Sequence, residues 1–288
     1  MNFKKLSTQV IERIAPSPTG GLHLGHVYSA FTAYQNAKNN QGLFKLRIED
    51  IDYTRCKLKF EKEIISNLSW LGISWDGQIM RQRNRKKTYA SAIEQLLKDG
   101  LLYPCSCTRT DIKKAVSAPH TDENTNITYP WTCRRNRPTK SVKALRLDIG
   151  KAIKMCGFKK VSFFEKENLN NNFSGEQSIL TSMIEHQFGD LVIARKDINT
   201  SYNLAVVIDD AAQMVTHVTR GNDLRAITPI QVLLQRLLCL PTPIYHHHKL
   251  LFEPTGKKIS KRSFPDTVSS FKTRGFTPND VIAMAFNL

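Results

Sequence analysis

The 288-residue sequence predicts an α/β protein built on a parallel sheet, with one inserted subdomain and a short helical end. Two observations predict this fold class. A strand, a loop, a helix and a second strand follow one another within residues 10–48, which is the length of one βαβ unit. The alternation stops between residues 105 and 188, where stretches rich in Pro, Asn, Thr and Lys take over. With 41% hydrophobic residues, the chain can bury a sizeable core.

The first third of the chain is predicted as strand, helix, strand, helix and helix. Apolar residues at helical spacing follow the loop PSPTGG, and the next strand reads LFKLRI. Gly100 ends the last of these helices. The predicted segments are, in chain order, 10–15, 27–37, 43–48, 59–71 and 88–99.

The rest of the chain divides into three predicted parts. Residues 191–221 read as strand-like and apolar, including the segment SYNLAVVIDDA, and PIQVLLQRLLCL reads as a helix. Residues 266–288 read as two short helices. The expected domains are the first half of the sheet domain (1–104), an inserted subdomain with long loops (105–188), the second half of the sheet domain (189–248), and a basic loop with a helical end (249–288).

The composition suits a soluble protein that binds a polyanion. The chain has 42 Lys and Arg residues against 25 Asp and Glu residues, which gives a formal charge of +17. No apolar run reaches the roughly 18 residues of a membrane span, and no signal-peptide stretch opens the chain, so we expect a cytoplasmic protein without a membrane partner. Six cysteines fit a reducing compartment, where a close cluster indicates a metal site.

Two motifs carry candidate chemistry. The loop APSPTGGLHLGH lies between the first strand and the first helix, where an α/β sheet binds nucleotides, and His23 and His26 can donate to phosphate oxygens. The alternative is that both histidines only cap the helix. The segment KKISKR, residues 257–262, can neutralise a leaving pyrophosphate, although an isolated run of this kind is more often a solvated basic turn.

Together, HLGH and KISKR resemble the HIGH and KMSKS signatures of class I aminoacyl-tRNA synthetases. The segments RIAPSPTGGLHLGH and RIEDID are similar to the glutamyl and glutaminyl branch, and the resemblance extends from Arg13 through VVIDDA and VTRGNDL to KISKR. It implies a Rossmann-type catalytic domain. Only 26 residues follow Arg262, too few for an anticodon-binding domain, and this architecture is similar to that of the glutamyl-queuosine tRNA(Asp) synthetases, truncated paralogues of glutamyl-tRNA synthetase.

The resemblance implies the roles of individual residues. Catalysis falls to His23, His26 and Lys261. The glutamate pocket is implied at Arg13, Ala15, Ser17, Glu49, Tyr202 and Arg220, and the ATP contacts, with Mg²⁺ bridging phosphates, at His23, His26, Lys258, Ser260 and Lys261. The alternative from the residues alone is that Arg47 and Glu49 are strand-end charges and that Tyr202 belongs to the core.

A third constellation joins C105-S-C107 to Y129-P-W-T-C133. Cys105, Cys107, Tyr129 and Cys133 could form one four-coordinate structural Zn²⁺ site, and ordinary reduced cysteines are the alternative. The resemblance favours zinc, because the family carries this pattern in the inserted subdomain. The other three cysteines have no partner spacing and read as structural.

Further basic residues cluster at 81–87 and 133–140, and with the segment 257–262 they suggest a surface that contacts RNA phosphates. Three consecutive histidines at 246–248 read as a solvated strand end, because neighbouring residues of a strand face opposite sides.

The resemblance implies a ligase that activates L-glutamate with ATP, releases pyrophosphate and transfers glutamate to queuosine in tRNA(Asp). AMP is the second product, and we expect a monomer. The alternatives are a minimal glutamyl-tRNA synthetase that charges tRNA(Glu), and a catalytically idle tRNA-binding paralogue.

Overall fold

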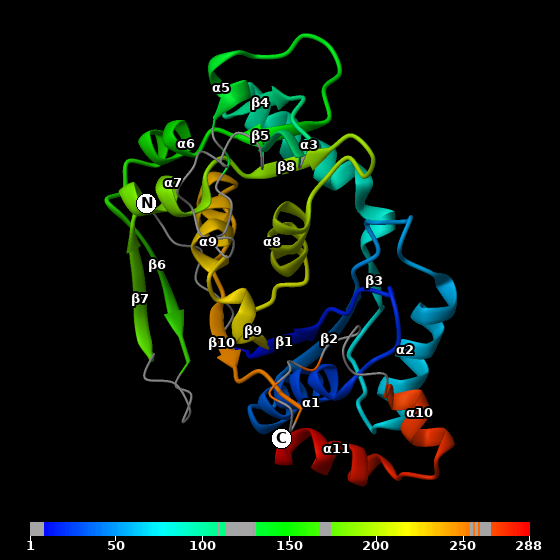
Figure 1. Ribbon diagram of the computed structural model, residues 1–288. Helices are drawn as coiled ribbons and strands as arrows, with labels where there is room; N and C mark the ends of the chain where they lie inside the picture. Colours follow the sequence, from blue (N-terminus) through cyan, green and yellow to red (C-terminus); the bar gives the residue numbers. More distant parts are fainter. Residues whose placement is uncertain are drawn as a thin grey trace.

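The computed structural model describes residues 9–108, 110–112, 129, 131–166, 174–253, 256, 259 and 266–288, and it has the predicted α/β architecture (Figure 1). Its strands are β1 Ile11–Ile14, β2 Leu43–Ile48, β3 Met80–Arg81, β4 Leu102–Cys105, β5 Ala144–Leu147, β6 Lys160–Glu165, β7 Gly175–Leu180, β8 Val192–Arg195, β9 His217–Gly221 and β10 Ile244–His248. Its helices are α1 Leu24–Asn39, α2 Leu58–Trp70, η1 Gln82–Arg85, α3 Lys86–Lys98, α5 Thr132–Arg135, α6 Ile149–Cys156, α7 Thr181–Phe188, α8 Tyr202–Ala212, η2 Asn222–Leu224, α9 Thr228–Leu237, α10 Val268–Thr273 and α11 Pro278–Asn287.

Parallel strands form the centre of the molecule, as predicted. β1 pairs with β2 and β2 with β3, while β10 pairs with β9 and β6, all in parallel. The two groups meet at β1 and β9, where Thr216 N–H donates to the Ile11 carbonyl at 2.9 Å and Ile11 N–H donates to Thr216 Oγ1 at 2.7 Å. The Glu12 carboxylate, which is fully buried, accepts from Thr219 Oγ1 at 2.7 Å and reinforces this junction. The carboxyl ends of β1, β2, β9 and β10 therefore lie at one edge of the structure.

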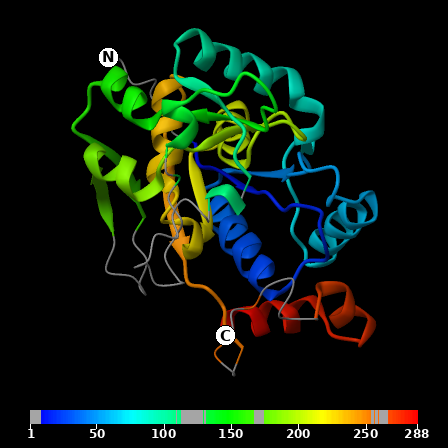
Figure 2. The same cartoon turned by 45° about the horizontal axis from the view of Figure 1, so that its top comes forward.

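Helices cover both faces of these strands (Figure 1). α1 packs on β1, β2 and β9, and with α2, α10 and α11 it encloses one hydrophobic core. α8 and α9 lie on the other face and share a second core with α3, α6 and α7. Figure 2 shows that the β6–β7 hairpin stands at the edge opposite α2. The helices predicted at 59–71, 88–99, within 229–240 and in the last 23 residues are confirmed within a few residues.

One predicted element is wrong. Residues 201–211 read as strand-like, but they form α8 and its N-terminal cap, in which the Ser201 hydroxyl accepts from Leu204 N–H at 3.4 Å. Seven consecutive residues, Leu204–Asp210, are buried because the helix packs on several sides. A helix buried all round has no polar face, so its apolar run cannot be distinguished from a buried strand by periodicity.

The region between the two halves of the parallel sheet contributes to two different sheets. β4, β5 and β8 form an antiparallel sheet, whereas β6 pairs with β10 of the parallel sheet and carries β7 as its antiparallel neighbour. The domain boundaries expected from sequence stay predictions. Within the described residues, no helix is both long and apolar enough to span a membrane.

Candidate active site

The first turn of α1 holds both histidines of the HLGH motif in fixed orientations. His23 is the N-cap, and its Nδ1 accepts from Gly25 N–H at 3.1 Å. His26 Nδ1 accepts from His23 N–H at 3.2 Å, which completes a capping box. Because Nδ1 is the acceptor in each neutral ring, the proton of each ring lies on Nε2. The capping role and the proposed phosphate-donor role are therefore compatible.

A cavity of about 500 Å³ opens above this helix end. The described residues predicted for the glutamate and ATP contacts all line it: Arg13, Ala15, Ser17, His23, His26, Glu49, Tyr202 and Arg220. Tyr202 is 37% exposed and borders the cavity, so the alternative of a core tyrosine is wrong. Lys258, Ser260 and Lys261 lie outside the described residues, but Ile259 of the same segment lines the cavity and donates its N–H to the Leu251 carbonyl at 2.9 Å.

Buried charges form a network beneath the cavity. Asp210 Oδ1 accepts from Arg47 Nη1 at 2.6 Å and from Arg13 Nε at 3.1 Å, and Glu49 Oε1 accepts from Arg47 Nη2 at 3.2 Å. Burial alone would raise the pKa of Asp210, but Arg47 and Arg13 hold it below its ordinary value. Burial raises the pKa of Glu49 despite the same two arginines. Arg47 and Glu49 are thus not solvated strand-end charges.

Arg220 differs from these arginines because only neutral groups hold it. Its Nε donates to His247 Nε2 at 3.0 Å, Nη1 to Gln231 Oε1 at 2.7 Å, and Nη2 to Thr228 Oγ1 at 2.8 Å and weakly to the Leu224 carbonyl at 3.5 Å. Its side chain forms no ion pair with a carboxylate of the described residues, although it is only 6% exposed. A buried guanidinium without a counter-ion is unfavourable, and it is therefore suited to a ligand carboxylate.

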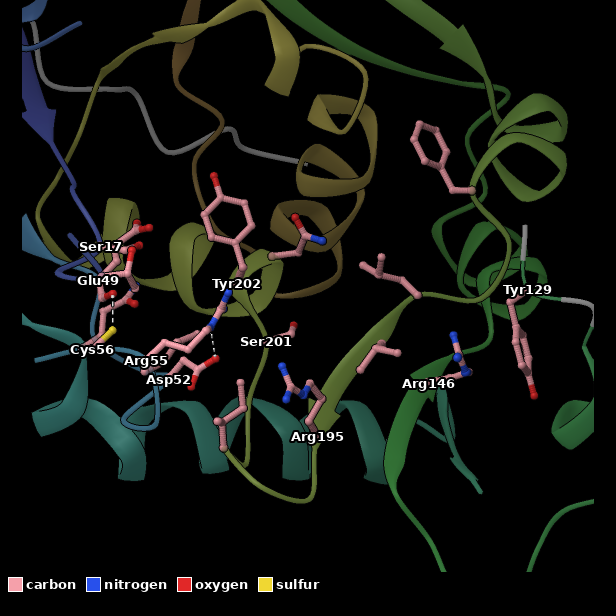
Figure 3. A pocket seen from close by; sticks show the side chains of 18 of the residues that line it. Ser17, Glu49, Asp52, Arg55, Cys56, Tyr129, Arg146, Arg195, Ser201 and Tyr202 are labelled. Atoms are coloured by element: carbon pink, nitrogen blue, oxygen red, sulfur yellow. Dashed lines mark hydrogen bonds and ion pairs between the residues drawn. The ribbon is translucent and has the colours of Figure 1, made fainter. Parts of the chain in front are cut away.

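A second cavity of about 580 Å³ adjoins the first and shares Ser17, Thr19, Glu49 and Tyr202 with it. In Figure 3, Ser17, Glu49 and Asp52 lie at one end, Arg195 and Ser201 in the middle, and Arg146 and Tyr129 at the other end. The second cavity thus extends from the predicted amino acid pocket toward the cysteine cluster.

The walls of this second cavity carry charged and aromatic groups from distant loops. In the wall, Asp52 Oδ2 accepts from Arg55 Nε at 2.8 Å, and Tyr129 and Tyr202 supply aromatic rings. Next to Asp52, but outside the cavity lining, the exposed Tyr53 donates its hydroxyl to the Asp197 carbonyl at 3.1 Å. The latter contact joins the loop after β2 to the loop after β8. Such a wall offers donors, acceptors and charge to a polar ligand.

The predicted metal ligands converge. The sulfur atoms of Cys105, Cys107 and Cys133 lie within 4.8 Å of one another, and Tyr129 Oη lies 3.6 Å from Cys105 Sγ and 3.7 Å from Cys107 Sγ. Tetrahedral zinc with Zn–S bonds of about 2.3 Å separates its sulfurs by about 3.8 Å, so this group fits zinc with small adjustments.

Neighbouring groups shift the pKa values of this cluster in opposite directions. Burial and the hydrogen bond with Cys133 raise the pKa of Cys107 to about 11. Burial alone would raise the pKa of Cys133, but hydrogen bonds from Tyr129 and from the Ser106 backbone lower it to about 6. Arg146 donates from Nε to Cys105 Sγ at 3.2 Å and lies 3.7 Å above the Tyr129 ring. All six cysteines are free thiols.

Several arginines of the predicted RNA-facing clusters are engaged within the protein. Arg81 and Arg83 pair with Glu61 at 2.6 and 2.8 Å, and Arg85 pairs with Asp209 at 2.6 Å. Arg134 likewise pairs with Asp190 and with Glu185. The exposed basic residues of the two clusters that have no such ion pair within the described chain are Lys86, Lys87, Arg135, Arg137 and Lys140.

The prediction of a solvated end for the histidine run is wrong. β10 is an interior strand between β9 and β6, so His247 is fully buried and His248 is 4% exposed. His248 lines the first cavity, and its Nε2 forms a hydrogen bond with Ser29 Oγ. Burial lowers the pKa of His248 to about 4.

Sequence reasoning did not assign Asp210, Thr219 or His248 to the site. Asp210 forms its contacts with Arg47 and Arg13 across 163 and 197 residues of sequence, respectively, where no local spacing could indicate them. The sequence did contain one signal for Asp210: two adjacent acids, Asp209 and Asp210, stand inside an apolar segment. Carboxylates buried with such a segment require charged or hydrogen-bonding partners.

Comparison with known proteins agrees with this fold. Residues 9–286 match the family described as tRNA synthetases class I (E and Q), catalytic domain. The chain is 44% identical over 280 residues to the Glutamyl-Q tRNA(Asp) synthetase of Rhodobacter capsulatus, covering 94% of this chain and 98% of that protein. It is 41% identical over 254 residues to the protein of that name from Geobacter sulfurreducens, covering 88% and 76%.

Two solved structures are also similar. A glutamate tRNA ligase from Elizabethkingia meningosepticum, in complex with its amino acid, gives a TM-score of 0.73 at 27% identity and matches 96% of this chain. Glutamate-tRNA synthetase from Elizabethkingia anophelis gives 0.75 at 26% identity, also over 96% of this chain. The chain spans 60% and 61% of the lengths of these two proteins. With its Rossmann-like fold and its match over nearly the whole sequence, the chain belongs to the class I tRNA synthetases of the E and Q type and is a ligase.

Proposed function

We propose that this ligase activates L-glutamate with ATP to form glutamyl-adenylate and pyrophosphate, and transfers the glutamyl group to queuosine in the anticodon loop of tRNA(Asp). The names of the curated relatives support this reaction. The observation that carries it for this chain is the charge of the first cavity, described next.

The charged side chains of the cavity complement glutamate. The charged side chains that line the cavity, histidines apart, are three positive groups, Arg13, Arg220 and Lys249, and two negative groups, Glu49 and Asp223, which leave a formal +1. Arg47 and Asp210 beneath the cavity form an ion pair and leave this balance unchanged. Free glutamate has two carboxylates and one ammonium, a net charge of −1. Arg220 has five N–H donors and four acceptors among the described residues, so it retains capacity for a carboxylate, while Glu49 can accept from the ammonium.

ATP would lie at the N-terminus of α1. The dipole of a helix start favours phosphate, and the Nε2–H groups of His23 and His26 can donate to the α-phosphate as charge develops on it. Mg²⁺ would arrive with ATP, held mainly by phosphate oxygens and water. Lys258, Ser260 and Lys261 would contact the triphosphate, and Lys261→Ala is expected to lower glutamate-dependent ATP–pyrophosphate exchange.

The acceptor nucleoside would enter through the second cavity. Since this cavity shares Ser17, Glu49 and Tyr202 with the first, a hydroxyl bound there could reach the carbonyl of an adenylate held by the shared wall (Figure 3). Transfer then requires no covalent intermediate with the protein, and the rate depends on positioning and on stabilisation of charge.

We also propose that Cys105, Cys107, Tyr129 and Cys133 hold one structural Zn²⁺, which would cross-link the start of the inserted region to its middle. Elemental analysis is expected to give about one zinc per chain. Cys133→Ser should reduce that content. The proposed location is the cytoplasm, and the proposed state is a monomer.

A transfer assay tests the function. The protein is incubated with ATP, labelled glutamate and either tRNA(Asp) bearing queuosine, tRNA(Asp) lacking it, or tRNA(Glu), and the RNA is digested to nucleosides. We expect label on the queuosine nucleoside of tRNA(Asp) alone. Label on the 3′-terminal adenosine of tRNA(Glu) would indicate the minimal glutamyl-tRNA synthetase instead. Absence of ATP–pyrophosphate exchange with every tRNA would indicate an idle paralogue.

A further inference from the structure

A row of buried hydrogen bonds connects three strands behind Arg220. The Glu165 carboxylate of β6 accepts from His247 N–H at 2.7 Å through Oε1, and its Oε2 lies 2.7 Å from His247 Nδ1. His247 Nε2 in turn accepts from Arg220 Nε at 3.0 Å. Glu165, His247 and Arg220 are 3%, 0% and 6% exposed, so bulk water does not compete for these contacts.

The chemistry of arginine fixes the state of the imidazole. A guanidinium can only donate, so His247 Nε2 must present its lone pair to Arg220. The ring proton then lies on Nδ1 and is donated to Glu165. Burial also lowers the pKa of His247, which favours the neutral ring.

The strand register makes this arrangement rigid. His247 of β10 is the direct register partner of Arg220 of β9, and β6 is hydrogen-bonded to the other edge of β10. Side chains of directly paired residues lie on the same face of a sheet, so the strand register itself places the His247 imidazole beside the Arg220 guanidinium. Gln231 and Thr228 of α9 hold the opposite side of the guanidinium.

We propose that Glu165 and His247 are positioning residues for substrate recognition by Arg220. The neutral imidazole of His247 lies between the Glu165 carboxylate and the Arg220 guanidinium. Glu165 orients and polarises the imidazole but does not contact the guanidinium. Direct contact with Glu165 would orient Arg220 and also neutralise it, whereas the intervening imidazole leaves its positive charge for a carboxylate in the cavity. This inference rests on the proposed function, because it takes glutamate as the ligand of Arg220.

Three substitutions of His247 test separately its hydrogen bond to Arg220 and its hydrogen bond to Glu165. Gln can place a carbonyl oxygen near the position of Nε2 and continue to accept from Arg220, whereas Asn can place its NH₂ near Nδ1 and continue to donate only to Glu165. Ala removes both contacts. Glu165→Gln keeps the volume but removes the charge that holds the Nδ1–H tautomer. Glu176→Gln, on the neighbouring strand β7 with a side chain 63% exposed, is the matched control.

The measurement is ATP–pyrophosphate exchange in the presence of tRNA(Asp), with KM for glutamate, KM for ATP and Tm for each variant. We expect His247→Asn, His247→Ala and Glu165→Gln to raise the glutamate KM by about 10- to 100-fold, the range for loss of a hydrogen bond to a charged group. The ATP KM should stay within about twofold, and His247→Gln and Glu176→Gln should stay within about threefold of wild type for glutamate.

Equal losses for His247→Gln and His247→Asn, or parallel changes in both KM values that follow Tm, would show a merely structural role and overturn the inference. The tautomer provides a readout that needs no activity: ¹⁵N NMR of the wild-type protein should show His247 protonated at Nδ1. Protonation at Nε2 contradicts the inference in any case. Wild-type protein without glutamate-dependent exchange would instead contradict the proposed function, and the NMR result would still decide the tautomer.

Discussion

Glu49 is a buried acidic residue of the cavity wall. It is 8% exposed, and within the described residues its carboxylate forms an ion pair with Arg47 alone, whereas Asp210 is held by two arginines. Burial raises the pKa of Glu49, so the ionised form is costly until a cation approaches. The ammonium of an amino acid supplies that cation, and binding of the amino acid is therefore expected to depend on the ionisation of this residue.

Glutamate affinity should consequently fall at low pH. Glu49 is ionised above its raised pKa, so the contribution of the ammonium contact is present above that pKa and is lost as pH falls through it. The dissociation constant of glutamate, measured by calorimetry at pH values from about 4 to about 8, tests this.

Glu49→Gln is the matched variant, since it preserves volume and cannot ionise. It should bind about 10- to 100-fold more weakly at neutral pH. The carboxylates of free glutamate titrate in the same way in the measurements on wild type and on Glu49→Gln. The difference between the two pH dependences of the dissociation constant therefore reports the ionisation of Glu49. Parallel curves for the two proteins would show that Glu49 does not meet the ammonium.

At the scale of elements, the first turn of α1 performs two tasks with the same two side chains. Each imidazole uses Nδ1 for the backbone of the helix start, which leaves Nε2–H as its other polar group at the cavity. A substitution can therefore damage the helix, the chemistry or both, and the two effects can be measured separately.

We predict different outcomes for two variants of His26. His26→Ala loses the acceptor for His23 N–H and should lower the free energy of unfolding by about 1 kcal/mol. His26→Glu keeps a capping-box acceptor and adds a favourable negative charge at the helix start, so its stability should match wild type. Both should reduce ATP–pyrophosphate exchange by about 100-fold or more, because both remove the donor. If the rate of ATP–pyrophosphate exchange fell only in His26→Ala, in proportion to its loss of stability, His26 would only cap the helix.

α8 carries two adjacent carboxylates toward different partners. Asp210 meets Arg13 and Arg47 beneath the cavity, whereas Asp209 accepts from Arg85, Gln82 and Tyr89. The helix is therefore fixed from two sides, and it begins at Tyr202, which borders both cavities. The interior anchor at Asp209 is thus part of what positions the site.

Removal of that anchor should be costly. Asp209→Ala leaves three donors without their acceptor and is expected to destabilise the protein by about 3 kcal/mol. Asp197→Ala is the control, because its pair with Arg195 is 46% and 43% exposed and should contribute less than about 1 kcal/mol. Urea unfolding measures both variants. A loss below about 1 kcal/mol for Asp209→Ala would show that other contacts hold α8.

At the scale of the whole molecule, the charge of +17 is not uniformly available to RNA. Arg81, Arg83 and Arg85 are paired with Glu61 and Asp209, which lie in the protein interior. Their contribution is to join η1 and the end of β3 to α2 and α8. The exposed basic residues Lys86, Lys87, Arg135, Arg137 and Lys140 are the better candidates for phosphate contacts.

The salt dependence of tRNA binding should distinguish the two groups. Replacement of Arg135, Arg137 and Lys140 by Gln should weaken tRNA binding and reduce the slope of log Kd against log salt by about 0.7–0.9 for each phosphate that the variant no longer neutralises. Replacement of Arg81 and Arg83 by Gln should lower stability and leave that slope unchanged. Filter binding between roughly 50 and 200 mM salt, the range over which such slopes are resolved, provides the test. The reverse pattern would place the RNA surface on η1.

The amino-acid sequence was sufficient to predict the order of strands and helices at both ends of the chain, the HLGH turn at a helix start, and the cysteine cluster, because residues close together in the chain encode each of them. Tertiary packing was needed to show that α8 is a helix, that His247 and His248 are interior, and that Arg220 lacks a counter-ion among the described residues. These features depend on partners such as Glu165 and His247, 82 residues apart, or Arg13 and Asp210, 197 apart. Burial and charge pairing are set by packing between distant segments, and a local sequence pattern does not specify which segments will meet.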